Sequence, residues 1–163
     1  GSAAQHSESY YSIFSHIPGL QGVVPSDAYT AKGLLTAAIR SDDPVIYFEH
    51  KGLYGNRGPV PEESYVLPLG KARTVRPGED ITLVGISRMT WVCTEAADEL
   101  AKQGINAEVV DLLSISPIDY DHVIESVKRT HRLVVVDEDT PAELLKRCPL
   151  FQRLFPAALK ESA

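Results

Sequence analysis

The chain has 163 residues, of which 44% are hydrophobic and 23% charged, so it can bury the core of one ordinary domain or two small ones. Its formal net charge of -6 disfavours a nucleic-acid partner, because binding to phosphates requires a clustered basic surface. We expect neither a membrane span nor a signal peptide. Cys93 and Cys148 are far apart and fit reduced thiols in an intracellular protein.

Helix and strand signals alternate in the first fifty residues, which is typical of α/β layering. The expected elements are a helix over residues 10–17, a strand over 21–24, a helix from 26 to about 40 and a strand over 45–48. Ser26 is predicted to cap the second helix, whose apolar stripe includes Leu35 and Ile39. The strand after Pro44 is an unbroken apolar run, so we predict a central parallel strand that is buried on both faces.

The second half of the chain follows a more regular pattern. Residues 51–63 contain three glycines and two prolines, which predicts a loop and the best domain boundary. The expected elements after it are an extended stretch over 65–75, a strand over 81–86, a helix around 91–100, a strand over 105–113, a helix from 116 and a strand over 132–138. Right-handed crossovers between these strands predict a parallel sheet with helices on its faces. In residues 142–163 apolar residues recur at helical spacing, but Pro149 interrupts the pattern.

Few residues form motifs that carry chemistry. Residues 85–90 lack the G-x-G-x-x-G pattern, so a dinucleotide site is not expected, and no phosphate loop or nucleophile elbow occurs. His6 precedes a helix in a loop of small residues, where an imidazole can meet a ligand; taken alone, it reads better as an exposed loop histidine. The other histidines lie near the ends of predicted elements, where capping or surface positions are expected: His16, His50, His122 and His131.

Eight stretches of the chain together carry a resemblance to a known family. They are residues 1–9, 14–20, 24–26, 31–35, 38–44, 68–72, 111–117 and 133–138. Their combination closely resembles the β subunit of thiamine-diphosphate-dependent 2-oxo acid dehydrogenase E1 components, of the pyruvate, branched-chain and acetoin dehydrogenase type. Transketolase and deoxyxylulose-phosphate synthase share the fold. The spellings Ala4-Gln5-His6-Ser7 and His16-Ile17-Pro18-Gly19-Leu20 favour the E1 β subunits over both.

The resemblance implies a fold and a division of the chain. The implied fold is α/β, with a partial pyrimidine-type domain followed by a transketolase C-terminal-like, Rossmann-like parallel-sheet domain. The implied parts are the second half of the pyrimidine-binding domain over 1–50, a linker over 51–64, the C-terminal-like domain over 65–141 and a non-matching tail over 142–163. The family's first half, with the glutamate that activates the cofactor, is not among these residues. We therefore expect the chain alone to be inactive, and leave open whether it is a fragment or a diverged paralogue.

Site residues, cofactors and partners are also implied by the resemblance. The family's active-site histidine of the β chain matches His6, whose implied work is to protonate the substrate or intermediate and to help pass the acyl group to lipoamide. Backbone carbonyls such as those of Ala38, Ser41 and Asp43 resemble a potassium-binding segment of some members, although this stretch is also a helix stop. The implied cofactors are thiamine diphosphate with Mg, at the interface with an α subunit, and potassium. The implied partners are the E1 α subunit, a second β subunit and the E2 lipoyl acyltransferase core, in the bacterial cytoplasm or the mitochondrial matrix.

Two functions remain in competition. The first is that of an E1 β component, in which a 2-oxo acid is oxidatively decarboxylated and the acyl group passes to lipoamide. The second is that of a non-catalytic assembly module that keeps only the subunit contacts. Turnover with a matching α subunit that disappears in His6→Ala favours the first. Binding without turnover, which we expect of this chain as it stands, favours the second. The sequence does not choose among the 2-oxo acids.

Overall fold

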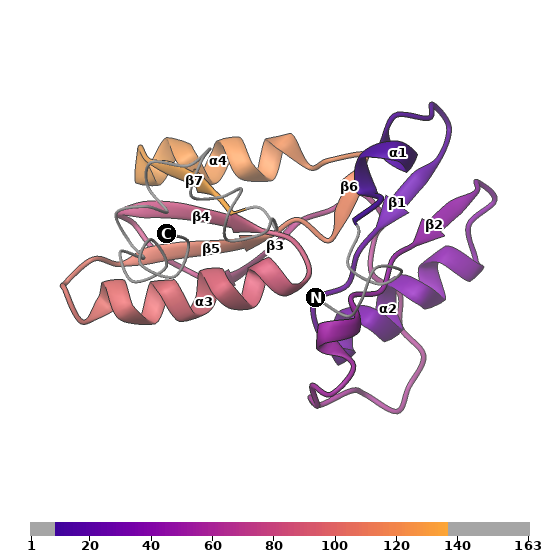
Figure 1. Cartoon of the computed structure of the whole chain (residues 1–163), viewed down its shortest axis with the longest axis horizontal. Helices are drawn as coiled ribbons and strands as arrows, with labels where there is room; N and C mark the ends of the chain where they lie inside the picture. Colours follow the sequence, from indigo (N-terminus) through magenta and orange to yellow (C-terminus); the bar gives the residue numbers. More distant parts are fainter. Residues whose placement is uncertain (1–8, 137–163) are drawn as a thin grey trace, which may run out of the picture.

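The computed structural model describes residues 9–136, which form two α/β units side by side along the long axis of the molecule (Figure 1). The helices and strands, in chain order, are α1 (Tyr11–Ser15), β1 (Gln21–Val23), α2 (Ala28–Ile39), β2 (Val45–Tyr47), the 3-10 helix η1 (Lys51–Leu53), β3 (Arg73–Arg76), β4 (Ile81–Gly85), α3 (Arg88–Ala101), β5 (Ala107–Asp111), β6 (Ser114–Ser116), α4 (Tyr120–Thr130) and β7 (Leu133–Val135). In this part of the chain no helix is both long and apolar enough to span a bilayer.

The first unit holds a sheet of strand order β2-β1-β6. β1 and β2 are parallel and are joined through α2, as the alternating signals predict. The prediction that β2 is a central strand buried on both faces is wrong for the described residues. β2 pairs with β1 alone and lies at the edge of the sheet, and its three residues are half-buried. An apolar run indicates burial, but it does not tell whether a second strand pairs alongside.

Helix α2 differs from its prediction in its cap and in its buried face. Its N-cap is Asp27 and not Ser26: the Asp27 carboxylate accepts a 2.7 Å hydrogen bond from the Thr30 backbone N–H, and the Thr30 side chain bonds back to Asp27, which completes a capping box. Leu35 and Ile39, which were predicted to face the core, are 45% and 76% exposed. The helix instead buries one turn of mostly small side chains, which a search for large apolar residues passes over: Thr30, Gly33 and Leu34.

Residues 65–69 pack against α2 in the first unit. The Leu67 backbone N–H donates to the carbonyl of Gly33 over 3.1 Å, and a Cβ on Gly33 would lie 2.6 Å from Leu67 Cγ, so this approach requires glycine. The first core consists of Val23, Leu34 and Leu113, with Val45, Tyr47, Leu67 and Leu69 around them. The domain boundaries given above stay a prediction.

The second unit holds a sheet of strand order β3-β5-β4-β7, with α3 on one face and α4 on the other (Figure 1). β4 is parallel to both β5 and β7, which confirms the predicted parallel sheet, and β3 adds an antiparallel edge that makes the sheet mixed. The apolar core under α3 consists of Leu83, Cys93, Ala97, Ala107 and Val109. Under α4 the Thr82 hydroxyl hydrogen-bonds those of Ser126 and Thr130 over 2.7 and 2.6 Å.

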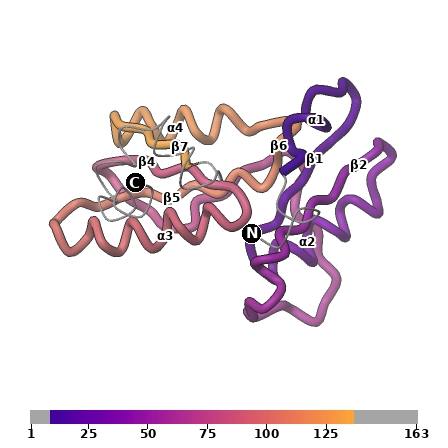
Figure 2. The backbone as a smooth tube through the Cα atoms, viewed as in Figure 1, coloured from indigo at the N-terminus to yellow at the C-terminus, as the bar shows by residue number. Residues whose placement is uncertain are grey.

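Strand β6 connects the two units. The chain leaves β5 through Leu113, which has a positive φ of 56°, and β6 then pairs antiparallel with β1 in the first sheet. Figure 2 shows this crossing, with the orange β6 beside the indigo β1. The preceding strand was expected to end at Leu113 and a helix to begin at Ser116, but residues 114–116 form β6 and the helix begins only after its N-cap Asp119. The first sheet therefore depends on a strand from the second half of the sequence.

Candidate functional site

A pocket of about 200 Å³ opens where the parallel strands β1 and β2 end and α2 begins. In a strand–helix–strand unit the carboxyl ends of the strands and the start of the helix meet at one edge, which is where α/β proteins usually bind ligands. One wall is the segment Pro25–Asp27, which follows β1. The opposite wall follows β2 and includes Tyr47, Glu49, His50 and Tyr54.

The wall after β2 is fixed by its own hydrogen bonds. The Tyr47 hydroxyl donates to the carbonyl of Ala31 over 2.9 Å, and burial, together with the charge of Glu49, raises the pKa of Tyr47 to about 12. The Tyr54 hydroxyl donates to the Glu49 carboxylate over 2.9 Å. His50 Nδ1 accepts a 3.0 Å hydrogen bond from the backbone N–H of Gly52 and so caps η1, which confirms the predicted capping role. In the neutral ring the proton of His50 therefore lies on Nε2.

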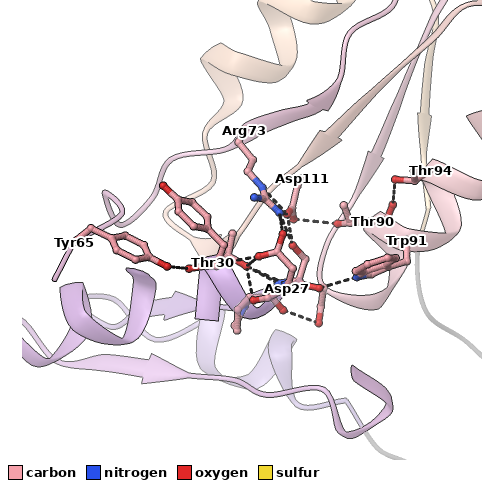
Figure 3. Close-up of polar contacts among 12 residues, drawn as sticks. Asp27, Thr30, Tyr65, Arg73, Thr90, Trp91, Thr94 and Asp111 are labelled. Atoms are coloured by element: carbon pink, nitrogen blue, oxygen red, sulfur yellow. Dashed lines mark hydrogen bonds and ion pairs between the residues drawn. The ribbon is translucent and has the colours of Figure 1, made fainter. Parts of the chain in front are cut away.

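Charged side chains of both units meet behind the segment Pro25–Asp27. Figure 3 shows Arg73 of β3 reaching Asp111 at the end of β5 and Asp27 at the start of α2. Arg73 Nη2 lies 2.6 Å from an Asp27 oxygen, and Nε lies 3.2 Å from an Asp111 oxygen. Asp111 is fully buried and also accepts hydrogen bonds from the hydroxyls of Ser26, over 2.5 Å, and Thr90, over 3.0 Å. The guanidinium of Arg73 therefore pairs with two carboxylates, one from each unit.

The ionisation of these groups follows from their surroundings. Burial raises the pKa of Asp111, which the hydrogen bond from Ser26 and the charge of Arg73 only partly offset. For Asp27 burial also acts upward, but the hydrogen bonds from Thr30 and Arg73 outweigh it and leave the pKa of Asp27 below its usual value. Burial acts to lower the pKa of Arg73, yet the two carboxylates hold it above the ordinary value. Within residues 9–136 no buried side-chain nitrogen or oxygen lacks a hydrogen-bond partner.

Of the residues predicted to form the site, His6 lies outside the described residues. The others do not line this pocket: Ala38 lies in the last turn of α2, and Ser41 and Asp43 follow its C-cap Arg40. They lie at the far end of a helix of 12 residues and about 18 Å in length. The Ser41 N–H donates to the Ala38 carbonyl over 3.3 Å, and the Asp43 carboxylate accepts from Gln21 over 3.2 Å. The Ala38 carbonyl also accepts from the N–H of the C-cap Arg40, and potassium binding here stays a prediction.

The described residues do not by themselves fit a diphosphate cofactor. The pocket presents the carboxylates of Asp27 and Glu49, and neither Lys nor Arg lines it. A diphosphate needs cationic side chains or a cradle of free backbone N–H groups, whereas the N-cap carboxylate of Asp27 already occupies the start of α2. The volume of the pocket, about 200 Å³, is also smaller than the ~300 Å³ at which small-molecule pockets usually begin. Across residues 9–136 no group of three or more His, Cys, Asp or Glu side chains is arranged to hold a metal ion.

The remaining histidines have structural positions. His16 is the C-cap of α1, and His131 ends α4 in a left-handed conformation with φ of 57°. His122 Nε2 lies 3.0 Å from the Thr74 hydroxyl, at an open pocket of about 310 Å³ that also includes Lys71 and Asp119. These positions agree with the capping and surface roles predicted for them.

Sequence reasoning did not identify Arg73 and Asp111, which carry the charges behind the pocket. A signal for Asp111 existed: a carboxylate that follows Val109 and Val110 at the end of a buried strand requires a cation or several donors. For Arg73 the pattern offers none, because a basic residue in an extended stretch next to a turn is common on surfaces.

Comparison with known proteins gives the class first. The chain matches the family described as transketolase, pyrimidine binding domain, over residues 2–57, and that described as transketolase, C-terminal domain, over residues 70–143. A solved structure described as a split gene transketolase, inactive beta4 tetramer, superimposes with a TM-score of 0.69 at 28% identity, covering 85% of this chain and 48% of that one. The fold is therefore a partial pyrimidine-binding domain followed by a transketolase C-terminal domain, as the resemblance implied.

The curated relatives narrow the class to one family. The chain is 55% identical over 139 residues to the acetoin:2,6-dichlorophenolindophenol oxidoreductase subunit beta of Cupriavidus necator, covering 85% of this chain and 41% of that protein. It is 51% identical over 140 residues to the pyruvate dehydrogenase E1 component subunit beta of Rhizobium meliloti, covering 85% and 30%. It is 46% identical over 139 residues to the 2-oxoisovalerate dehydrogenase subunit beta of Bacillus subtilis, covering 85% and 42%.

The chain belongs to the family of E1 β subunits of the pyruvate, branched-chain and acetoin dehydrogenases. It spans less than half the length of these relatives. The pyrimidine-binding domain is characteristic of thiamine-diphosphate-dependent enzymes.

Proposed function

We propose that the chain is the β-subunit component, or a piece of it, of a dehydrogenase E1 enzyme. The reaction is the oxidative decarboxylation of a 2-oxo acid, with transfer of the acyl group to lipoamide. The observation that carries the proposal is the 55% identity to an acetoin oxidoreductase β subunit over 139 residues, which extends through both domain matches. The names of the relatives include acetoin, pyruvate and 2-oxoisovalerate, and the identities do not choose among them.

In this proposal His6 is the active-site residue of the chain. Its imidazole protonates the substrate or intermediate and helps to pass the acyl group on, a role that general acids with a pKa near neutrality perform well. Thiamine diphosphate, held with Mg, supplies the stabilised carbanion when it is bound. Potassium held by the carbonyls of Ala38, Ser41 and Asp43 would fix the loop between α2 and β2.

The proposed partners follow from what the described residues lack. The pocket offers two carboxylates and no cation for a diphosphate, so the cofactor requires groups from outside residues 9–136, which we assign in part to an E1 α subunit. A second β subunit and the E2 lipoyl acyltransferase core complete the assembly. We place it in the bacterial cytoplasm or the mitochondrial matrix, because the relatives include bacterial proteins and a mitochondrial one.

A chimeric β subunit tests the catalytic role. Residues 3–141 replace the matching segment of the Cupriavidus necator β subunit, and the chimera is combined with the α subunit of that organism, thiamine diphosphate, Mg and, in parallel assays, acetoin or the 2-oxo acid pyruvate. The bleaching of 2,6-dichlorophenolindophenol, the acceptor in the name of that relative, reports turnover. The chimera and its His16→Ala control are expected to turn over, and His6→Ala is expected to abolish turnover.

The second candidate function is a non-catalytic assembly module. It is favoured by the similarity to the solved structure that is described as an inactive beta4 tetramer. A chimera that folds and binds the α subunit but remains inactive would favour the assembly module.

A further inference from the structure

One wall of the pocket, the segment Pro25–Asp27, belongs to the first unit but is also bonded extensively to the second. The Ser87 hydroxyl, just before α3, donates to the carbonyl of Pro25 over 3.1 Å. The Trp91 indole Nε1–H, in the first turn of α3, donates to the carbonyl of Ser26 over 2.7 Å (Figure 3). The carbonyls of Pro25 and Ser26 thus accept from side chains of the second unit, whereas that of Asp27 accepts from the Ala31 N–H of α2.

The side chains of Ser26 and Asp27 in the wall are also bonded to the second unit. The Ser26 hydroxyl donates to Asp111, and Arg73 Nη2 donates to the Ser26 hydroxyl over 3.0 Å and to Asp27 over 2.6 Å. From the first unit itself the wall receives the capping bonds of Thr30. Arg73 is the one group that bonds both side chains of the wall and the buried carboxylate behind them.

The charges make Arg73 decisive for this arrangement. Asp111 and Asp27 both bond its guanidinium, so they are neighbouring carboxylates with one cation between them. Without that cation the two like charges repel, and the exposed partner moves more easily than the buried one. Asp27 has a side chain 31% exposed, whereas that of Asp111 has 0%, so Asp27 and the wall that carries it would move.

We propose that Arg73 is a positioning residue, which holds the segment Pro25–Asp27 against Asp111, so that the second unit sets the shape of the pocket formed by the first. Arg73 acts through the wall and does not itself line the pocket. That the pocket works in catalysis depends on the function proposed above, whereas the positioning depends only on the geometry.

The single tryptophan of the chain offers a direct readout, since Trp91 bonds the wall. In Arg73→Met the fluorescence emission of the full chain is expected to shift to the red, with a larger acrylamide quenching constant, because the bond from the indole to Ser26 is loosened. The emission maximum of Arg73→Lys is expected to lie between those of the unaltered chain and Arg73→Met, because an ammonium cannot reproduce the two-pronged hydrogen bonding of a guanidinium. Arg76→Met is the matched control, since Arg76 lies on the same strand and pairs with the exposed Asp98; its emission should match the unaltered chain.

Far-UV circular dichroism checks that each variant is folded. If Arg73→Met is unfolded, the emission and quenching of Arg73→Lys are used to test the proposal. A folded Arg73→Met, or the Lys variant in its place, with unchanged emission and quenching would overturn the proposal. In the chimeric β subunit Arg73→Met is expected to raise KM more than it lowers kcat, because a misplaced wall weakens binding before it alters the reacting groups. A moved indole in a chimera that never turns over would leave the positioning intact and refute the proposed function. An unmoved indole in an active chimera would refute the positioning only.

Discussion

Replacing Arg129 by methionine tests how far the second unit depends on a buried charge pair. Glu108 lies in the middle of β5 with a side chain only 3% exposed, and both of its carboxylate oxygens lie 2.8 Å from Arg129 Nη2 of α4. Breaking a buried pair by removing one partner costs roughly 3–5 kcal/mol. The Arg129 side chain is 55% exposed, so water screens the pair, and we expect a loss of about 2–3 kcal/mol. For a chain of this size the thermal midpoint should fall by roughly 5–10 °C.

The neighbouring residue supplies the control. Lys128 forms an ion pair with Glu125 on the same helix, and the two side chains are 65% and 62% exposed. Because solvent-exposed pairs contribute little, Lys128→Met is expected to leave the thermal midpoint unchanged. The double variant Glu108→Gln, Arg129→Met should recover part of the loss, since it removes the unpaired charge. Equal midpoints for Arg129→Met and Lys128→Met would refute this reasoning.

Three further predictions concern single residues. Gly85→Ala places a Cβ 2.7 Å from the backbone at the start of α3 and should lower the free energy of unfolding by about 1–3 kcal/mol, whereas Gly55→Ala, with nothing within 4 Å, should not. Burial, together with the nearby carboxylate of Asp111, raises the pKa of Cys93 to about 12. In a Cys148→Ser background the Cys93 thiol of the native protein should therefore resist alkylation at pH 8 and react only on unfolding. Rapid labelling of the native protein would contradict this. Because the pKa of Tyr47 is raised to about 12, its neutral hydroxyl stabilises the fold below pH 10, and this stabilisation is lost between pH 10 and 12. In Tyr47→Phe the free energy of unfolding should therefore fall less over this pH range than in the unaltered chain. An equal fall in both proteins would refute the prediction.

The sequence predicts the elements better than it predicts their neighbours. The periodicity of residues 81–135 specifies which strands are parallel, because each strand is followed by a helix that must cross over the sheet. The edge position of β2 was missed, because a strand pattern does not specify what lies beside it. β6 was missed for a related reason: it has three residues, and its partner β1 lies more than ninety residues earlier in the chain.

Side-chain roles at the pocket depend on contacts between distant parts of the chain. Asp27 is the local cap of α2, yet its bond to Arg73 joins positions 46 residues apart. Ser26 was predicted to cap α2 because serine is a good N-cap, but its hydroxyl bonds the more distant Asp111 instead. Local propensity identifies candidate donors and acceptors, and tertiary contacts then decide which partner each one takes.

The rate of dye reduction by the chimeric β subunit, with and without His6→Ala, tests the central claim most directly. The account assigns proton transfer at the substrate to His6, and a positioned general acid or base contributes about 100-fold to 10,000-fold to a rate. It therefore predicts an active chimera whose rate falls by at least about 100-fold in His6→Ala and is retained in His16→Ala. Equal rates in the chimera and its His6→Ala variant would contradict the catalytic assignment.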